Sequence, residues 1–158
     1  MYAETIEIFK FNELTDQAKE RARDWWRTDL EFSWNAESIN SIRAFCDEFG
    51  VNLKDWSVGP YSSIDYTTDA KNEHFRGRKL REFKRDTMPT GYCLDCSLWQ
   101  TFCDEFKRTG DAKAAFDSAL WEGFKAWRAD MESQLEDDYI DEMLEINEYK
   151  FTADGYIH

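Results

Sequence analysis

The strongest constraint on the fold is a run of apolar residues between Asp111 and Glu148 that recurs every three or four positions. The successive spacings are four, four, three, four, four, four and four, which is the period of an amphipathic α-helix. The run predicts one long helix whose apolar stripe faces a core. Its members are Phe116, Leu120, Phe124, Trp127, Met131, Leu135, Tyr139 and Met143.

The second half of this predicted helix is acidic. From Ala129 to Glu148 it contains no Lys or Arg, and its acids are Asp130, Glu132, Glu136, Asp137, Asp138, Asp141, Glu142, Glu145 and Glu148. Like charges three or four residues apart destabilise a helix by roughly 0.2–0.5 kcal/mol per pair. Acids near a helix C-terminus also oppose the macrodipole. The simple interpretation is a solvated helix face, and the alternative is a charged surface kept for a partner.

The composition predicts a single domain, residues 1–158. The chain has 158 residues, of which 42% are apolar, enough for one core. Its net charge of −13 disfavours direct binding to nucleic acid or to an anionic membrane, and favours a basic partner surface. No apolar run reaches the ~18 residues of a membrane span, and the N-terminus lacks the pattern of a signal peptide. A cytoplasmic location with reduced cysteines is therefore expected.

The remaining pattern predicts an α+β fold in which about four helices, including the long acidic C-terminal helix, pack on a small antiparallel sheet. Alternation and turn signals indicate strands, and three-to-four-residue spacing indicates helices. A helix capped by Thr15 follows the first strand, and a terminal hairpin requires positive φ at Gly155. The predicted strands are Thr5–Phe11, Val51–Gly59 and Ser62–Thr67, the further helices Ala36–Phe49 and Leu94–Arg108, and the hairpin Glu148–His158.

Cys93 and Cys96 form a Cys-x-x-Cys pair that suggests a zinc or redox site, with Cys103 and His74 as further candidate ligands. Structural zinc requires four converging ligands, usually from two such pairs, and only one pair is present. Buried, reduced thiols that face the core are the favoured interpretation. A nucleophilic site needs Ser or Cys beside a histidine and an orienting acid, but the sequence has only His74, in a basic polar run, and His158, the last residue. It also lacks a glycine-rich phosphate loop, so we expect no cofactor, no metal and no catalytic activity.

Two further features remain ambiguous in the sequence. The run Lys71–Arg85 has seven basic and two acidic residues, and Phe75 and Phe83 within it could stack on nucleic-acid bases. Docking against the acidic helix, or plain solvation, is favoured. Among seven tryptophans, Trp25 is adjacent to Trp26, and Trp121 lies off the apolar stripe. Trp25 and Trp121 are therefore candidates to contact a partner, which includes a second copy of the chain.

The two ends of the chain resemble a loose family of small phage and prophage accessory proteins. The opening TIEIFKFNELTDQAKERARDWWR (residues 5–27) is similar to that family's start, and NEYKFTADG (residues 147–155) is similar to its ending. Some of these proteins carry antitoxin-like labels. The resemblance implies a phage accessory role in the host cytoplasm, and it supplies no catalytic residues.

The leading hypothesis is a non-enzymatic, phage-encoded inhibitor of a host defence protein that handles nucleic acid, of the anti-CRISPR or anti-restriction type. It would imitate nucleic acid, since helical carboxylates recur roughly every 5–6 Å. The second hypothesis is an antitoxin-like or regulatory protein that masks a partner through aromatic contacts, and the third is a metal or redox enzyme. The predicted partner-binding residues are Glu132, Glu136, Asp137, Asp141, Glu142, Glu145, Trp25 and Trp121.

Overall fold

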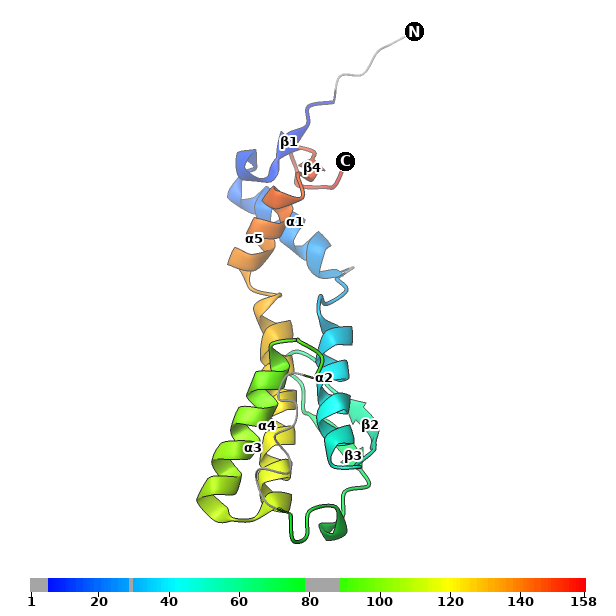
Figure 1. Cartoon of the computed structure of the whole chain (residues 1–158). Helices are drawn as coiled ribbons and strands as arrows, with labels where there is room; N and C mark the ends of the chain where they lie inside the picture. The colour runs from blue at the N-terminus through cyan, green and yellow to red at the C-terminus, as the bar shows by residue number, and fades with distance from the viewer. Residues whose placement is uncertain (1–5, 29, 79–88) are drawn as a thin grey trace. The chain divides into compact units, whose positions relative to one another are not determined.

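The computed structural model describes residues 6–28, 30–78 and 89–158, and it has the predicted α+β character (Figure 1). Those residues contain five α-helices and two separate antiparallel sheets of two strands each. The chain forms two compact units. Unit 1 consists of Met1–Phe32 together with Glu132–His158, and unit 2 consists of Ser33–Met131. The single domain expected for residues 1–158 stays a prediction.

Unit 1 is built on the packing of α1 (Asp16–Thr28) against α5 (Asp137–Ile146). The predicted cap is confirmed, because the backbone N–H of Ala18 donates to Thr15 Oγ1 at 3.2 Å. Small side chains on α1 meet larger apolar ones on α5, and aromatic rings from both chain ends complete the core. The buried core residues are Phe11, Leu14, Ala18, Ala22, Ile140, Leu144 and Phe151.

The first strand pairs with the last one, so it is not the possible third strand of the sheet of residues 51–67. β1 (Phe9–Lys10) is antiparallel to β4 (Lys150–Phe151), with Phe9 opposite Phe151. Most of the predicted strand Thr5–Phe11 is not strand, since Ile6–Ile8 lies outside β1, a 3-10 turn begins at Phe11 and Thr5 lies outside the described residues. Both termini of the chain therefore contribute to one core.

The terminal hairpin is confirmed. Thr152 N–H donates to Tyr156 O at 2.8 Å, and Phe151 bridges to Ile157. Gly155 has φ +88°, and a Cβ at this position would lie 2.1 Å from the backbone oxygen of Ala18. The turn therefore needs glycine both for its backbone conformation and for its close approach to α1.

We predict that Gly155→Ala destabilises the protein by at least about 2 kcal/mol, because it adds a backbone clash to the strain of a left-handed conformation. Thermal unfolding followed by circular dichroism measures the loss. Gly110→Ala is the matched control, since Gly110 has φ +69° but open space at its Cβ position. Equal losses for the two variants would contradict the proposed clash with α1.

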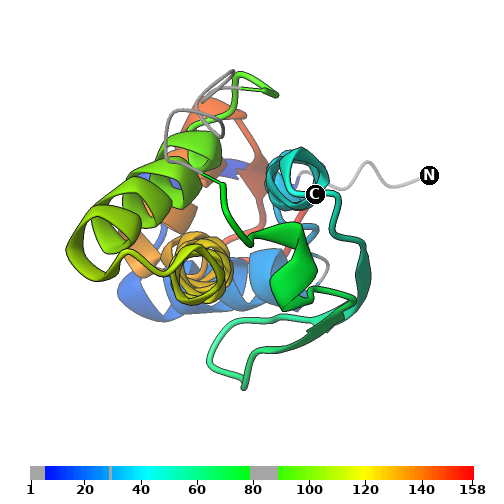
Figure 2. The same ribbon diagram turned by 60° about the horizontal axis from the view of Figure 1, so that its bottom comes forward.

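Unit 2 contains α2 (Asn35–Glu48), α3 (Leu94–Thr109), all but the last two residues of α4 (Ala112–Ser133), and a hairpin of β2 (Leu53–Ser57) with β3 (Asp65–Thr68). A 3-10 turn, η2 (Asn72–His74), follows the hairpin. Figure 2 shows α2 and α4 nearly end-on, with α3 and the hairpin on opposite sides of them. The core is aromatic: Phe45 stacks on Phe116 at 5.4 Å, and Tyr66 of β3 stacks on Phe124 at 4.5 Å.

The prediction of one helix over 111–148 is wrong, because α4 ends at Ser133 and α5 begins at Asp137. Glu136, the N-cap of α5, has extended backbone (φ −72°, ψ 144°), and Asp137 and Asp138 favour a helix start there. The first five stripe residues are buried as predicted, whereas Leu135, Tyr139 and Met143 are only half-buried. Repeated four-residue steps rotate around a helix, so Met143 would lie about 180° from Phe116 on an unbroken one.

None of the described helices is both long enough and apolar enough to cross a bilayer.

Candidate partner-binding site

The acidic charge of the protein is concentrated in unit 1. Its two segments contain 17 acidic and 6 basic residues, a net charge of −11. Unit 2 contains 16 acidic and 14 basic residues, a net charge of −2 over 99 positions. A strongly acidic surface on this protein therefore belongs to unit 1, which produces most of its negative long-range field.

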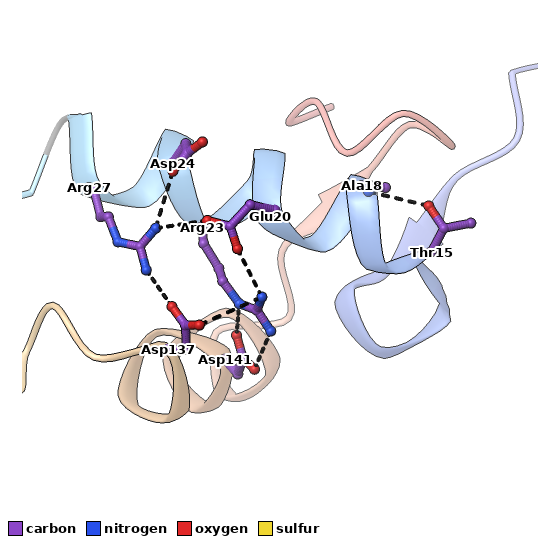
Figure 3. A network of polar contacts seen from close by, with 8 residues as sticks. All are labelled: Thr15, Ala18, Glu20, Arg23, Asp24, Arg27, Asp137 and Asp141. Atoms are coloured by element: carbon purple, nitrogen blue, oxygen red, sulfur yellow. Dashed lines mark hydrogen bonds and ion pairs between the residues drawn. The ribbon is translucent and has the colours of Figure 1, made fainter.

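Two arginines of α1 bind several of the acids of unit 1 (Figure 3). Arg23 makes a bidentate contact with Asp141, with Nε–Oδ1 at 2.7 Å and Nη2–Oδ2 at 2.9 Å. It also reaches Glu20 at 3.1 Å. Arg27 contacts Glu20, Asp24 and Asp137. The network links α1 to the first turns of α5, in addition to the apolar contacts between these helices.

The network favours the charged form of both arginines further. The hydrogen bond to Asp141 holds the pKa of Arg23 above its usual range, although burial acts in the opposite direction. For Arg27, burial alone would lower the pKa, but hydrogen bonds to Asp137 and Glu20 outweigh it and raise the pKa. Bidentate pairing of a half-buried guanidinium is among the stronger polar contacts in proteins. It therefore positions α5 rather than leaving Asp137 and Asp141 available to a partner.

The six acids expected to bind a partner therefore divide into two groups. Asp137 and Asp141 face α1 within the network, and Glu132 is half-buried and has an interaction of its own. Glu136, Glu142 and Glu145 are exposed, and no ion pair joins them to a basic residue within the described part of the chain. Asp137 is also exposed, but its carboxylate is held by Arg27, so only the second group is both exposed and without an ion pair within the described residues.

The exposed face of α5 also includes Asp138, which the sequence-based prediction of the site omitted. Asp138, Glu142 and Glu145 are spaced four and three residues apart and lie on one helix face, which we call the outer acidic stripe. Their axial separations are about 6 Å and 4.5 Å. The stripe lies away from Ile140 and Leu144, the residues that α5 buries. To predict the outer acidic stripe from sequence, one must first know that Ile140 and Leu144 form the buried face of α5.

Comparisons with protein-family models, with curated proteins and with solved structures found no match. The function is therefore inferred from the site itself.

The two candidate tryptophans differ in their surroundings. Trp25 is half-buried in unit 1 and packs edge-on against Tyr149 at 5.3 Å and Phe151 at 6.3 Å. Trp121 is 41% exposed on α4. The sequence-based prediction missed two other exposed aromatics of unit 2, Trp34 (56%) and Tyr61 (75%). Both have left-handed backbone, with φ of 71° and 57°, which no sequence pattern had indicated.

The candidate metal ligands do not converge among the described residues, where no group of three or more His, Cys, Asp or Glu side chains could hold an ion. Cys93 and Cys96 are exposed, Cys103 is half-buried and Cys46 is buried. The expectation that Cys93 and Cys96 face the core is therefore wrong. The ring of His74 accepts a hydrogen bond at Nδ1 from Lys71 N–H at 3.0 Å. Its neighbour Phe75 is buried.

Phe75 is not available to stack on a nucleic-acid base, since it packs against Phe49 and Phe116. Arg76, Arg78 and Lys113 line an open cleft of about 590 Å³ in unit 2. Much of the Lys71–Arg85 run, including Phe83, lies outside the described residues. Docking of this run against the acidic helix stays a prediction.

We predict that Arg23→Met destabilises the protein by about 1–3 kcal/mol, because it leaves Asp141 half-buried without its charged partner. Chemical denaturation followed by tryptophan fluorescence measures the change. Arg108→Met is the control, because its ion pair with Glu105 lies on the surface of α3 and should change stability little. A similar small effect for both variants would contradict the structural role of the network.

Proposed function

We propose that the protein is a non-enzymatic binding protein that presents the acidic surface of unit 1 to a basic groove of its partner. The observation that carries this proposal is the concentration of charge: unit 1 has a net charge of −11 and displays the outer acidic stripe. Glu145 lies near the C-terminal end of α5, where no basic residue compensates the macrodipole. A face kept in spite of these penalties favours a role in recognition over simple solvation.

The partner class that fits such a surface is a protein that binds nucleic acid. Duplex DNA presents one charge per ~1.7 Å of axis, and a groove that has evolved for phosphates offers Lys and Arg at matching intervals. The resemblance of both chain ends to phage accessory proteins supports a phage-encoded inhibitor of a host defence protein of this kind. Such an inhibitor would act in the host cytoplasm.

We expect reversal of the outer acidic stripe, Asp138→Lys with Glu142→Lys and Glu145→Lys, to weaken partner binding by roughly tenfold or more. The assay is capture of purified bacterial nucleases and defence complexes on the immobilised protein, with duplex DNA as competitor. Binding should fall between roughly 50 and 200 mM salt, and DNA should displace the captured protein.

The matched control reverses three exposed acids of unit 2, Asp47, Asp55 and Asp104, which changes the net charge equally. If the two triple variants lose binding to the same extent, only overall charge matters and the proposed site is wrong. Binding that survives reversal of the stripe, in a variant whose circular dichroism is unchanged, would also contradict the proposal.

A second candidate function is an antitoxin-like protein that masks its partner through aromatic contacts. The observation that favours it is the exposure of Tyr61 and Trp121 on unit 2. Arg128 donates to Ser62 O at 3.0 Å, which ties the hairpin tip to α4, and Trp121 lies two turns before Arg128 on the same helix face. Exposed aromatic rings held on a rigid frame are typical of the residues that dominate binding energy at interfaces.

For this second function we predict that Tyr61→Ala combined with Trp121→Ala weakens the free energy of partner binding by about 2 kcal/mol or more. We also expect salt to change the affinity little. Calorimetric titration at low and high salt separates the two cases. Tyr156→Ala is the control, since Tyr156 is an exposed aromatic residue of unit 1. Strong salt dependence together with normal binding by the double variant would favour the acidic surface.

A further inference from the structure

Cys93 and Cys96 lie together at the start of α3. Cys93 is the N-cap residue and Cys96 belongs to the first turn, where its backbone N–H donates to Cys93 O at 3.1 Å. Both thiols are exposed, whereas Leu94 and Asp95 between them are buried. The first turn of the helix therefore presents two cysteine residues to the surrounding solution.

The spacing of this pair is compatible with a disulfide bond. Residues three apart on a helix have Cβ atoms about 5–6 Å apart, and a disulfide needs about 3.5–4.5 Å, with Cα atoms up to ~6.8 Å apart. Cys93 has helical backbone angles (φ −59°, ψ −26°), and a small change of these angles at the N-cap can close this difference. The thiolate is the form that attacks a disulfide, and the first-turn N–H groups of α3 stabilise negative charge.

An exposed aromatic surface adjoins Cys93. The Tyr92 hydroxyl is hydrogen-bonded to Ser38 and Cys93, and burial raises the pKa of Tyr92. Trp34, 56% exposed, stacks on Tyr92 with 6.0 Å between ring centroids and 16° between planes. The indole ring of Trp34 contacts Tyr92 and is otherwise largely exposed on the surface. Such a ring suits contact with a polypeptide rather than with a small thiol.

A buried polar network fixes the segment that leads into Cys93. Thr90 donates to Asp95 Oδ2 from its backbone N at 3.0 Å and from Oγ1 at 2.8 Å, and Ser41 Oγ lies 3.1 Å from Thr90 Oγ1. Asp95 is fully buried, and its Oδ1 has no hydrogen-bond partner within the described residues. A buried carboxylate with an unsatisfied oxygen, located between two exposed thiols in sequence, is unusual for a purely structural helix start.

We propose that Cys93 and Cys96 form a dithiol that exchanges with a disulfide bond of a polypeptide partner. The Cys93 thiolate attacks one sulfur of the partner's disulfide, that S–S bond breaks, and the released partner thiolate takes up a proton. The Cys96 thiolate then attacks Cys93 Sγ in the mixed disulfide and releases the second partner thiol. Two electrons pass to the partner, and the Cys93–Cys96 disulfide is the oxidised product. This activity is independent of the acidic surface of unit 1.

The first test equilibrates the full chain with mixtures of reduced and oxidised glutathione, and identifies the products by alkylation and mass spectrometry of peptides. The expected product is an intramolecular Cys93–Cys96 disulfide that has lost two hydrogens. Cys96→Ser should accumulate glutathione on Cys93, because no second thiol resolves the adduct. Cys46 should be alkylated only on unfolding, since it is buried and burial raises its pKa to about 12.

Cys103→Ser is the matched control, because Cys103 lies further along α3 and the variant should still form the disulfide. The proposal is overturned if glutathione adds separately to Cys93 and Cys96 and no internal disulfide forms, or if the disulfide formed involves Cys103. Circular dichroism confirms that each variant is folded.

A second measurement tests the polypeptide partner. Trp34→Ala should slow reduction of a disulfide-bonded peptide with aromatic flanking residues by severalfold, and leave the rate with oxidised glutathione unchanged. If the variant and the parent protein reduce the peptide at equal rates, the aromatic surface has no role in binding the partner. Equal slowing with both oxidants would show that Trp34 acts only on the structure around Cys93.

Discussion

The contact of Arg23 with Asp141 joins α1 to α5, the two helices on which unit 1 is built. Unit 1 has a large excess of negative charge, and its helices α1 and α5 lie far apart in sequence. Two arginines at their interface bind Glu20, Asp24, Asp137 and Asp141, which places positive charge where the acids are most crowded. Ala18 and Ala22 keep α1 close enough to bury Ile140 and Leu144. Other acids of α5 lie on its outer face, where solvent and salt screen their charges.

The apolar pattern predicted the core of α4 and the ends of α2 and α3 to within one residue, because these depend on local spacing and capping. It could not predict which acids are paired, since Arg23 and Asp141 are 118 positions apart and no periodicity relates them. The same limit applies to β1, whose partner is at the other end of the chain. The break at Glu136 was recognisable in principle, because four-residue steps drift around a helix and two aspartates follow the break.

The exposure of Cys93 and Cys96 is explained by the helical register of α3, and the general preference of cysteine for burial gave the wrong expectation. Free cysteines are commonly buried, but α3 turns Leu98 and Phe102 inward, and Leu94 lies one turn earlier on the same face. Cys93 and Cys96 flank that face, so their exposure follows from the helix register. The burial of Asp95 has no such local signal, because its partner Thr90 lies before the helix and Ser41 belongs to α2.

Unit 1 is interrupted by the whole of unit 2, and this arrangement orders events during synthesis. When α1 leaves the ribosome, the strand and helix that complete its core have not yet been translated. At about 5–20 residues per second, more than a hundred further residues take roughly 5–25 s. Unit 2, whose residues are contiguous, can fold on the nascent chain during this interval. The anionic face of α5 therefore acquires its final geometry only after unit 2 has been translated, when α1 and α5 meet.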